Sequence, residues 1–345
     1  MRVKNWTYFL AVATLLGVSL FATSCERDNR EEPVVEKEAI SFRSAQSNGE
    51  GRSRVVIADD EALQNACASG EGIGVWGIVN DDVNTNASLL DNVKLTFDTA
   101  ISDWTYEPTQ YWIRGAKHDF WAIYPYSAAD CSLNPTTGIL TRTNITLGTT
   151  NPANNVDYMC AVSSRDLADP AASTGPVPLE LRHAMSLLEF RFVNAMGFVD
   201  AVTDISLNGH LYKASLAFAR DGVLEGTTDG VVDILVTPTG DLAEANLFQG
   251  QSLTNIDKNI STSHNLFGNV GSIVVLPQEV EGKSVFFNLT VGSSPSNINL
   301  GILPITEWLP GKKYVYTVTL TTSTITCDVI VVDWIKDEVE LVPVE

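Results

Sequence analysis

The chain has 345 residues, of which 44% are hydrophobic, and a formal net charge of −20. This length can hold two domains of ordinary size, and the hydrophobic content is too high for a disordered chain. The acidity disfavours binding to nucleic acid, and it disfavours binding to an anionic membrane surface by charge, because both need a basic protein surface.

The N-terminus has the pattern of an export signal. A positively charged start precedes an apolar run from Tyr8 to Phe21, which is too short for a comfortable membrane span. Residues 1–24 are therefore predicted to be a signal peptide, with Cys25 directly after the cleavage point. The pattern resembles a bacterial lipoprotein signal, although Ala22 stands where leucine is commoner. It predicts acylation of Cys25, with palmitate as an acyl chain, and attachment to the outer membrane. An ordinary signal peptide followed by a chance cysteine is the alternative.

Residues 25–54 are predicted to be a lipidated segment that contains one detachable strand. An acidic run follows the cysteine, and Glu38–Arg43 then alternates as a short strand does. The segment ends in a polar, basic run at 49–54, which is expected to be open to a protease.

From residue 55 onward the pattern is almost entirely that of β-strands. Short apolar or alternating runs are separated by clusters of Gly, Asn, Asp and Pro, and a helical turn is expected only at 59–68. The sequence predicts an all-β protein with two tandem β-sandwiches, at 55–195 and 196–345. Residues 127–155 are rich in Ser, Thr and Asn, and they predict surface loops or a weak hairpin.

No catalytic or metal-binding pattern is recognised, so no enzymatic activity, metal or cofactor is predicted. The four histidines are scattered, and His183, beside a strand start, is expected to be a hydrogen-bonding residue rather than a ligand. A glycosidase pair remains open, because two carboxylates from distant strands leave no local pattern. Four cysteines besides Cys25 could form one or two disulfides or remain buried thiols: Cys67, Cys131, Cys160 and Cys327.

The stretch from Trp104 to Tyr126 is rich in aromatic residues. In a sandwich without helices such rings usually fill the core, which is the favoured interpretation. An exposed platform that stacks on sugars is the alternative, and it would indicate a surface glycan-binding lipoprotein that does not polymerise.

Several runs together resemble the fimbrillin family, the pilus subunits of Bacteroides and Porphyromonas relatives. The similarity covers nearly the whole chain, and it rests on these runs: Gly72–Gly77, Tyr111–Trp112, Phe120–Pro125, Leu181–Phe190, Val274–Gln278, Trp308–Tyr316 and Asp328–Trp334. The resemblance implies two transthyretin-like β-sandwiches and a fimbrial subunit with a role in adhesion. It also implies partners: other pilin subunits, an arginine-specific protease, and a receptor on a host or bacterial surface.

The resemblance further implies assembly by donor strand exchange. Cleavage after an arginine would remove Glu38–Phe42 together with the lipid. The best match for that arginine is Arg54, with Arg52 and Arg43 as rivals. The empty groove would then accept the C-terminal strand of a neighbouring subunit, which would add a strand to the sheet. The donated residues would be Val339, Leu341, Val342 and Val344. Such head-to-tail contacts do not close, so they generate a filament on the cell surface.

Overall fold

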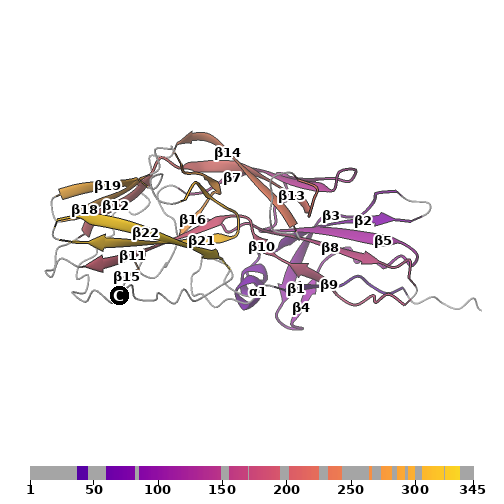
Figure 1. Ribbon diagram of the computed structural model, residues 1–345. Helices are drawn as coiled ribbons and strands as arrows, with labels where there is room; N and C mark the ends of the chain where they lie inside the picture. The colour runs from indigo at the N-terminus through magenta and orange to yellow at the C-terminus, as the bar shows by residue number, and fades with distance from the viewer. Residues whose placement is uncertain are drawn as a thin grey trace, which may run out of the picture. The chain divides into compact units, whose positions relative to one another are not determined.

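The computed structural model describes residues 37–45, 60–81, 85–148, 155–169, 171–194, 202–224, 232–242, 264–265, 273–281, 286–291, 294–299, 305–321 and 323–334. These residues form 22 strands and one helix (Figure 1). The predicted all-β class is therefore confirmed. The division into two transthyretin-like sandwiches with a boundary at residue 195 stays a prediction.

Six antiparallel strands form a central sheet in the order β10–β8–β5–β2–β3–β4. Their bounds are Ile73–Asn80 for β2, Ala87–Asp98 for β3, Asp103–Thr105 for β4, Lys117–Tyr124 for β5, Met159–Asp166 for β8 and Arg182–His183 for β10. Alternate side chains of β2 and β5 enter two different buried clusters: Val75 and Phe120 belong to one, Trp76 and Trp121 to the other. These strands are thus buried on both faces, which explains the unbroken runs of apolar residues and glycine at 73–79 and of apolar residues at 120–124.

Helix α1 and strands β1 and β9 contribute to the cluster on one face of this sheet (Figure 1). Helix α1 spans Asp60–Ala68, where the sequence predicted a helical turn, and it buries Leu63 and Cys67. Strand β1, Phe42–Ala45, pairs in parallel with β9, Val177–Glu180. Phe42 in β1 packs against Phe120 in β5, so residues 42–45 lie against the central sheet.

The cluster on the other face is completed by a four-stranded sheet in the order β14–β13–β7–β6. The bounds are Cys131–Asn134 for β6, Ile139–Thr146 for β7, Leu211–Arg220 for β13 and Val232–Leu242 for β14. Strand β7 pairs with β13, so this sheet takes strands from both sides of residue 195. Residues 127–155 do contain a hairpin, β6–β7, but Leu140 and Ile145 are buried. The hairpin is part of the core because β13 gives β7 a second partner.

The remaining strands form three further sheets. The largest has the order β15–β11–β21–β22, with β16 also paired to β11 and with a parallel β11–β21 pair. Its bounds are Ser186–Asn194 for β11, His264–Asn265 for β15, Ile273–Val275 for β16, Lys312–Leu320 for β21 and Ile325–Asp333 for β22. The two smaller sheets contain β12 (Val202–Asn208), β18 (Phe286–Val291) and β19 (Ser294–Asn299), and the pair β17 (Gln278–Glu279) and β20 (Glu307–Trp308).

Candidate functional site: the seat of residues 38–45

Residues 38–45, which we call the N-terminal segment, lie between two other parts of the chain. On one side, the Ile40 N–H donates to the Gln110 carbonyl at 2.8 Å, and the Trp112 N–H donates to the Glu38 carbonyl at 3.0 Å. On the other side, the Val177 N–H donates to the Ser41 carbonyl at 2.8 Å, where the parallel β1–β9 pair begins. The segment thus acts as an inserted strand with partners along both edges. We call residues 106–114 and 171–180 the seat.

Two side chains of the N-terminal segment are fully buried: Ile40 is 2% exposed and Phe42 is 1% exposed. The ring of Phe42 makes edge contacts with the rings of Tyr106 and Phe120, with 5.6 Å between centroids in each pair. The Tyr106 hydroxyl donates to the Ile40 carbonyl at 2.9 Å, and burial raises the pKa of this phenol above its ordinary value. The apolar contact is the main stabilising term, because burying a Phe or Ile side chain contributes about 1.5–3 kcal/mol each.

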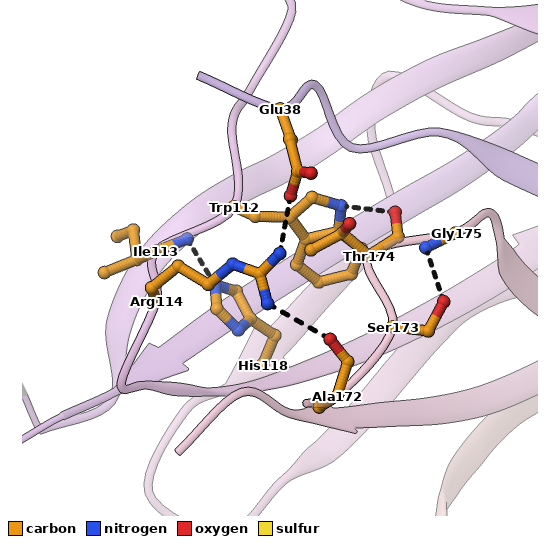
Figure 2. Close-up of polar contacts among 9 residues, drawn as sticks. All are labelled: Glu38, Trp112, Ile113, Arg114, His118, Ala172, Ser173, Thr174 and Gly175. Atoms are coloured by element: carbon orange, nitrogen blue, oxygen red, sulfur yellow. Dashed lines mark hydrogen bonds and ion pairs between the residues drawn. The ribbon is translucent and has the colours of Figure 1, made fainter. Parts of the chain in front are cut away.

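Glu38 connects the start of the segment to the seat through polar contacts, shown in Figure 2. The Arg114 guanidinium lies 2.8 Å from the Glu38 carboxylate, and it also donates to the Ala172 carbonyl at 3.1 Å. A hydrogen bond from the Thr174 side chain and the nearby Arg114 together hold the pKa of Glu38 below its ordinary value. Residues 171–176 therefore form a loop that is fastened beside the segment.

The opposite part of the seat is held in place by His118 (Figure 2). This side chain is buried, and burial lowers its pKa, so the ring is neutral at neutral pH. Its Nε2 atom accepts a hydrogen bond from the Ile113 N–H at 3.3 Å, and the Trp112 ring packs edge-on against it at 5.0 Å. The Trp112 indole N–H donates to the Thr174 carbonyl at 3.0 Å, which joins the two halves of the seat.

The structure describes only some of the residues predicted for this site. The N-terminal segment is described, and Ala39 pairs with Tyr111, as an inserted strand requires. Arg43 lies in β1, opposite Pro178, with its side chain exposed. The other predicted residues lie outside the described ranges: Cys25, Arg52, Arg54, Val339, Leu341, Val342 and Val344.

The sequence did not point to Arg114, Tyr106 or the loop at 171–176. A single arginine in a polar loop has no local pattern that distinguishes it from other surface arginines. The aromatic content of the stretch that contains Tyr106 was recognised, but the contact of Tyr106 with Ile40 was not. These contacts depend on which segments meet, and that is a property of the fold.

The other expectations can be compared with the described residues. Most rings between Trp104 and Tyr126 are buried: Trp104, Trp112, Phe120, Trp121 and Tyr124. They form core, so they do not provide an exposed platform for sugars. His183 lies 2.9 Å from the Asp157 carboxylate, as expected for a hydrogen-bonding histidine.

The four described cysteines are free thiols, so the disulfides considered from the sequence do not form in this structure. Burial raises the pKa of Cys67 and of Cys327 to about 12. Among the described residues, no group of three or more His, Cys, Asp or Glu side chains could hold a metal ion. The described part of the chain also contains no helix long and apolar enough to cross a membrane.

The fold is that of an all-β protein in which an N-terminal segment is held between two other parts of the chain. Residues 54–334 match a family model described as fimbrillin-like, and the chain therefore belongs to the fimbrillin-like family. Members of this family are fimbrial structural subunits of a cell-surface appendage, which is not a class of enzymes.

Solved structures share the fold at low sequence identity. A fimbrial protein from Bacteroides vulgatus ATCC 8482 has a TM-score of 0.55 and 13% identity, over 86% of this chain and 99% of that chain. A proposed cell adhesion protein from Bacteroides uniformis ATCC 8492 has a TM-score of 0.50 and 17% identity, over 88% of this chain and 100% of that chain. A search of curated protein sequences finds no match.

Proposed function

We propose that the chain is exported as a lipoprotein precursor and then polymerises by strand exchange into an adhesive fimbrium. Acylated Cys25 holds the precursor at the outer membrane. An arginine-specific protease cuts after Arg54, and the N-terminal segment leaves together with the lipid. The emptied seat then binds the C-terminal strand, residues 339–344, of the next subunit. The assembled fimbrium adheres to a receptor on a host or bacterial surface.

The observation that supports this proposal is the way in which the N-terminal segment is held. Its contacts are two buried side chains and main-chain hydrogen bonds on both edges, all of which another strand could reproduce. Without the segment, the seat would expose an apolar groove and unpaired groups at Gln110, Trp112 and Val177. A strand added from another chain satisfies both requirements at once.

Trp334, the last described residue before the proposed donor strand, is held in place. Trp334 is buried, its ring stacks on that of His183 at 4.1 Å between centroids, and its N–H donates to the Gly311 carbonyl at 2.9 Å. Residues 335–345 follow directly from this anchored tryptophan. The anchoring of Trp334 favours presentation of the residues after it to a neighbour, because less conformational freedom is lost on binding when the preceding chain is already fixed.

The position of Arg43 favours a cut farther along the chain. Its main chain belongs to the paired strand β1, and a protease acts most readily on exposed, unpaired backbone. Cleavage there would also leave Ser44 and Ala45 in the ladder with β9. We therefore prefer Arg54, with Arg52 as its rival.

The N-terminal residue of the mature protein on the cell surface tests the cleavage step. We expect a start at Val55 in the unchanged protein and an uncut, lipidated precursor in the Arg54→Ala variant, with Arg43→Ala as the matched control. A mature protein that still begins at Cys25 would contradict cleavage. Normal filaments from the Arg54→Ala variant would contradict its importance for assembly.

Deletion of residues 339–345 tests donation of the C-terminal strand. We expect monomers that are still processed at the N-terminus, which separates assembly from processing. Filaments of unchanged length from this deletion would show that another segment fills the seat.

A further inference from the structure

The seat discriminates among the residues of any strand that occupies it. Positions 38, 40 and 42 of an extended segment point to the same side. In this structure, position 38 offers a carboxylate to Arg114, whereas positions 40 and 42 are buried apolar sites. The seat therefore selects a pattern in which a carboxylate is followed, two and four residues later, by apolar side chains. Figure 2 shows the Arg114 end of this arrangement.

The C-terminal sequence contains the same pattern, with Asp337 followed by Val339 and Leu341. We propose that Arg114 binds the Asp337 carboxylate of a second copy of this chain and thereby fixes the register of the donated strand. This inference rests on the proposed function, and it names the residue pair that sets the alignment. Val339 then occupies the site of Ile40, and Leu341 occupies the site of Phe42.

Most other registers place a charge in the apolar site of Ile40. Shifts by one residue in either direction bring Glu338 or Glu340 there, and a shift by two residues brings Asp337 itself. An unpaired carboxylate is strongly disfavoured in such a site. A shift by two residues in the other direction puts Pro343 at the site of Phe42 and leaves Arg114 facing Val339.

One other register preserves the pattern, with Glu340 at Arg114 and Pro343 at position 41. In the Asp337 register, by contrast, Pro343 falls at position 44. The disulfide test below distinguishes these two registers, because it pairs position 174 with either position 337 or position 340.

The ion pair contributes alignment more than affinity. Both Arg114 and Glu38 are about half exposed, at 48% and 49% for their side chains, so solvent screens their attraction. For such a pair, loss of one partner changes binding by about two- to fivefold. The Ala172 carbonyl holds the guanidinium in place, which leaves Arg114 oriented toward an incoming carboxylate. Reversal of one charge should have a larger effect, because attraction becomes repulsion.

Charge reversal in the full chain, expressed in the bacterium that produces it, tests the proposal. We expect Arg114→Glu or Asp337→Lys alone to lower the yield of surface polymer by about fivefold or more. Both changes together should restore it to within about twofold, because the pair is re-formed with its signs exchanged. As the matched control, Glu340→Lys combined with Arg114→Glu should not restore the yield, because Glu340 does not face Arg114 in this register. If the unchanged chain polymerises while neither reversal has an effect, the register proposal is wrong and strand exchange stands.

Disulfide cross-linking determines directly which residue of the donated strand lies beside position 174, and this result does not depend on the yield of polymer. The Thr174 side chain lies near the Glu38 carboxylate and lowers its pKa, so a cysteine at 174 should meet a cysteine at 337 of a strand in this register. We expect disulfide-linked dimers from Thr174→Cys combined with Asp337→Cys, and none above background from Thr174→Cys combined with Glu340→Cys. Cross-linking through 340 instead would overturn the Asp337 register. If the unchanged chain forms no polymer at all, the proposed function fails, and this inference fails with it.

Discussion

Truncation of Phe42 to alanine should release the N-terminal segment without unfolding the rest of the protein. The Phe42 ring is 1% exposed and makes edge contacts with two aromatic rings, so its loss leaves a cavity in a packed site. Changes of this kind cost about 3–5 kcal/mol. Opening of the segment should therefore become roughly a hundredfold or more easier. Strand β21 should be unaffected, because it does not contact Phe42 in the described cluster.

Hydrogen exchange followed by mass spectrometry measures this effect in the intact chain. The amides of residues 38–45 should exchange about a hundredfold faster in the Phe42→Ala variant, while a peptide covering β21 keeps its rate. The exposed neighbour provides a control, since Arg43→Ala should leave both rates nearly unchanged. Equal acceleration in both regions would mean that the segment is part of one cooperative unit and cannot detach alone. An unchanged rate at 38–45 would show that Phe42 does not hold the segment.

Three further predictions concern stability, measured by urea unfolding. Gly72→Ala should lower the free energy of unfolding by about 1–3 kcal/mol, because φ is +81° and an added Cβ would lie 2.8 Å from a backbone oxygen. Gly70→Ala is the control, and it should lower the free energy of unfolding less, because an added Cβ there has no atom within 4 Å. Burial lowers the pKa of His210 to about 4 from an ordinary value of 6.5. As the pH falls, His210 therefore takes up its proton in the unfolded chain before it does so in the folded protein. The free energy of unfolding should decrease by roughly 3 kcal/mol as the pH drops from 6.5 to about 4. His210→Gln should lose that slope. Tyr316→Phe should lower the free energy of unfolding by about 1–3 kcal/mol. The buried Trp308 N–H donates to the Tyr316 hydroxyl at 2.8 Å, and the substitution removes this acceptor.

The strands were predictable where the pattern is local. Residues 38–43 were recognised as a strand because Ile40 and Phe42 alternate with small or polar residues, and the structure places both side chains in the core. The partner of this strand was not predictable, since β9 is distant in sequence and pairs in parallel. The pairing of β7 with β13 was missed for the same reason. Residues 127–155 contain few apolar side chains, and only the second partner explains why Leu140 is buried.

For the candidate site too, local sequence runs were predictable, whereas contacts between distant segments were not. The arginines of the basic run at 49–54 and the apolar alternation near the C-terminus are visible in the sequence, and both belong to the proposed assembly. Arg114 and the loop at 171–176 became recognisable only when the structure brought them to Glu38. Residues that act by receiving another segment have no pattern of their own, because their role depends on what lies opposite.

In the proposed assembly, cleavage would control exchange more than affinity does, because of the connection between the N-terminal segment and the rest of the chain. While the N-terminal segment belongs to the same chain, its effective concentration at the seat is on the order of millimolar, so a neighbour's strand competes poorly. A cut after the segment removes this advantage without altering any contact. The cleaved segment and the neighbour's strand then compete as separate molecules. Once the cleaved segment has dissociated, no linker returns it to the seat. The donor strand can then replace the N-terminal segment if its contacts with the seat are comparably favourable, provided that its own subunit is held nearby, as in a growing filament.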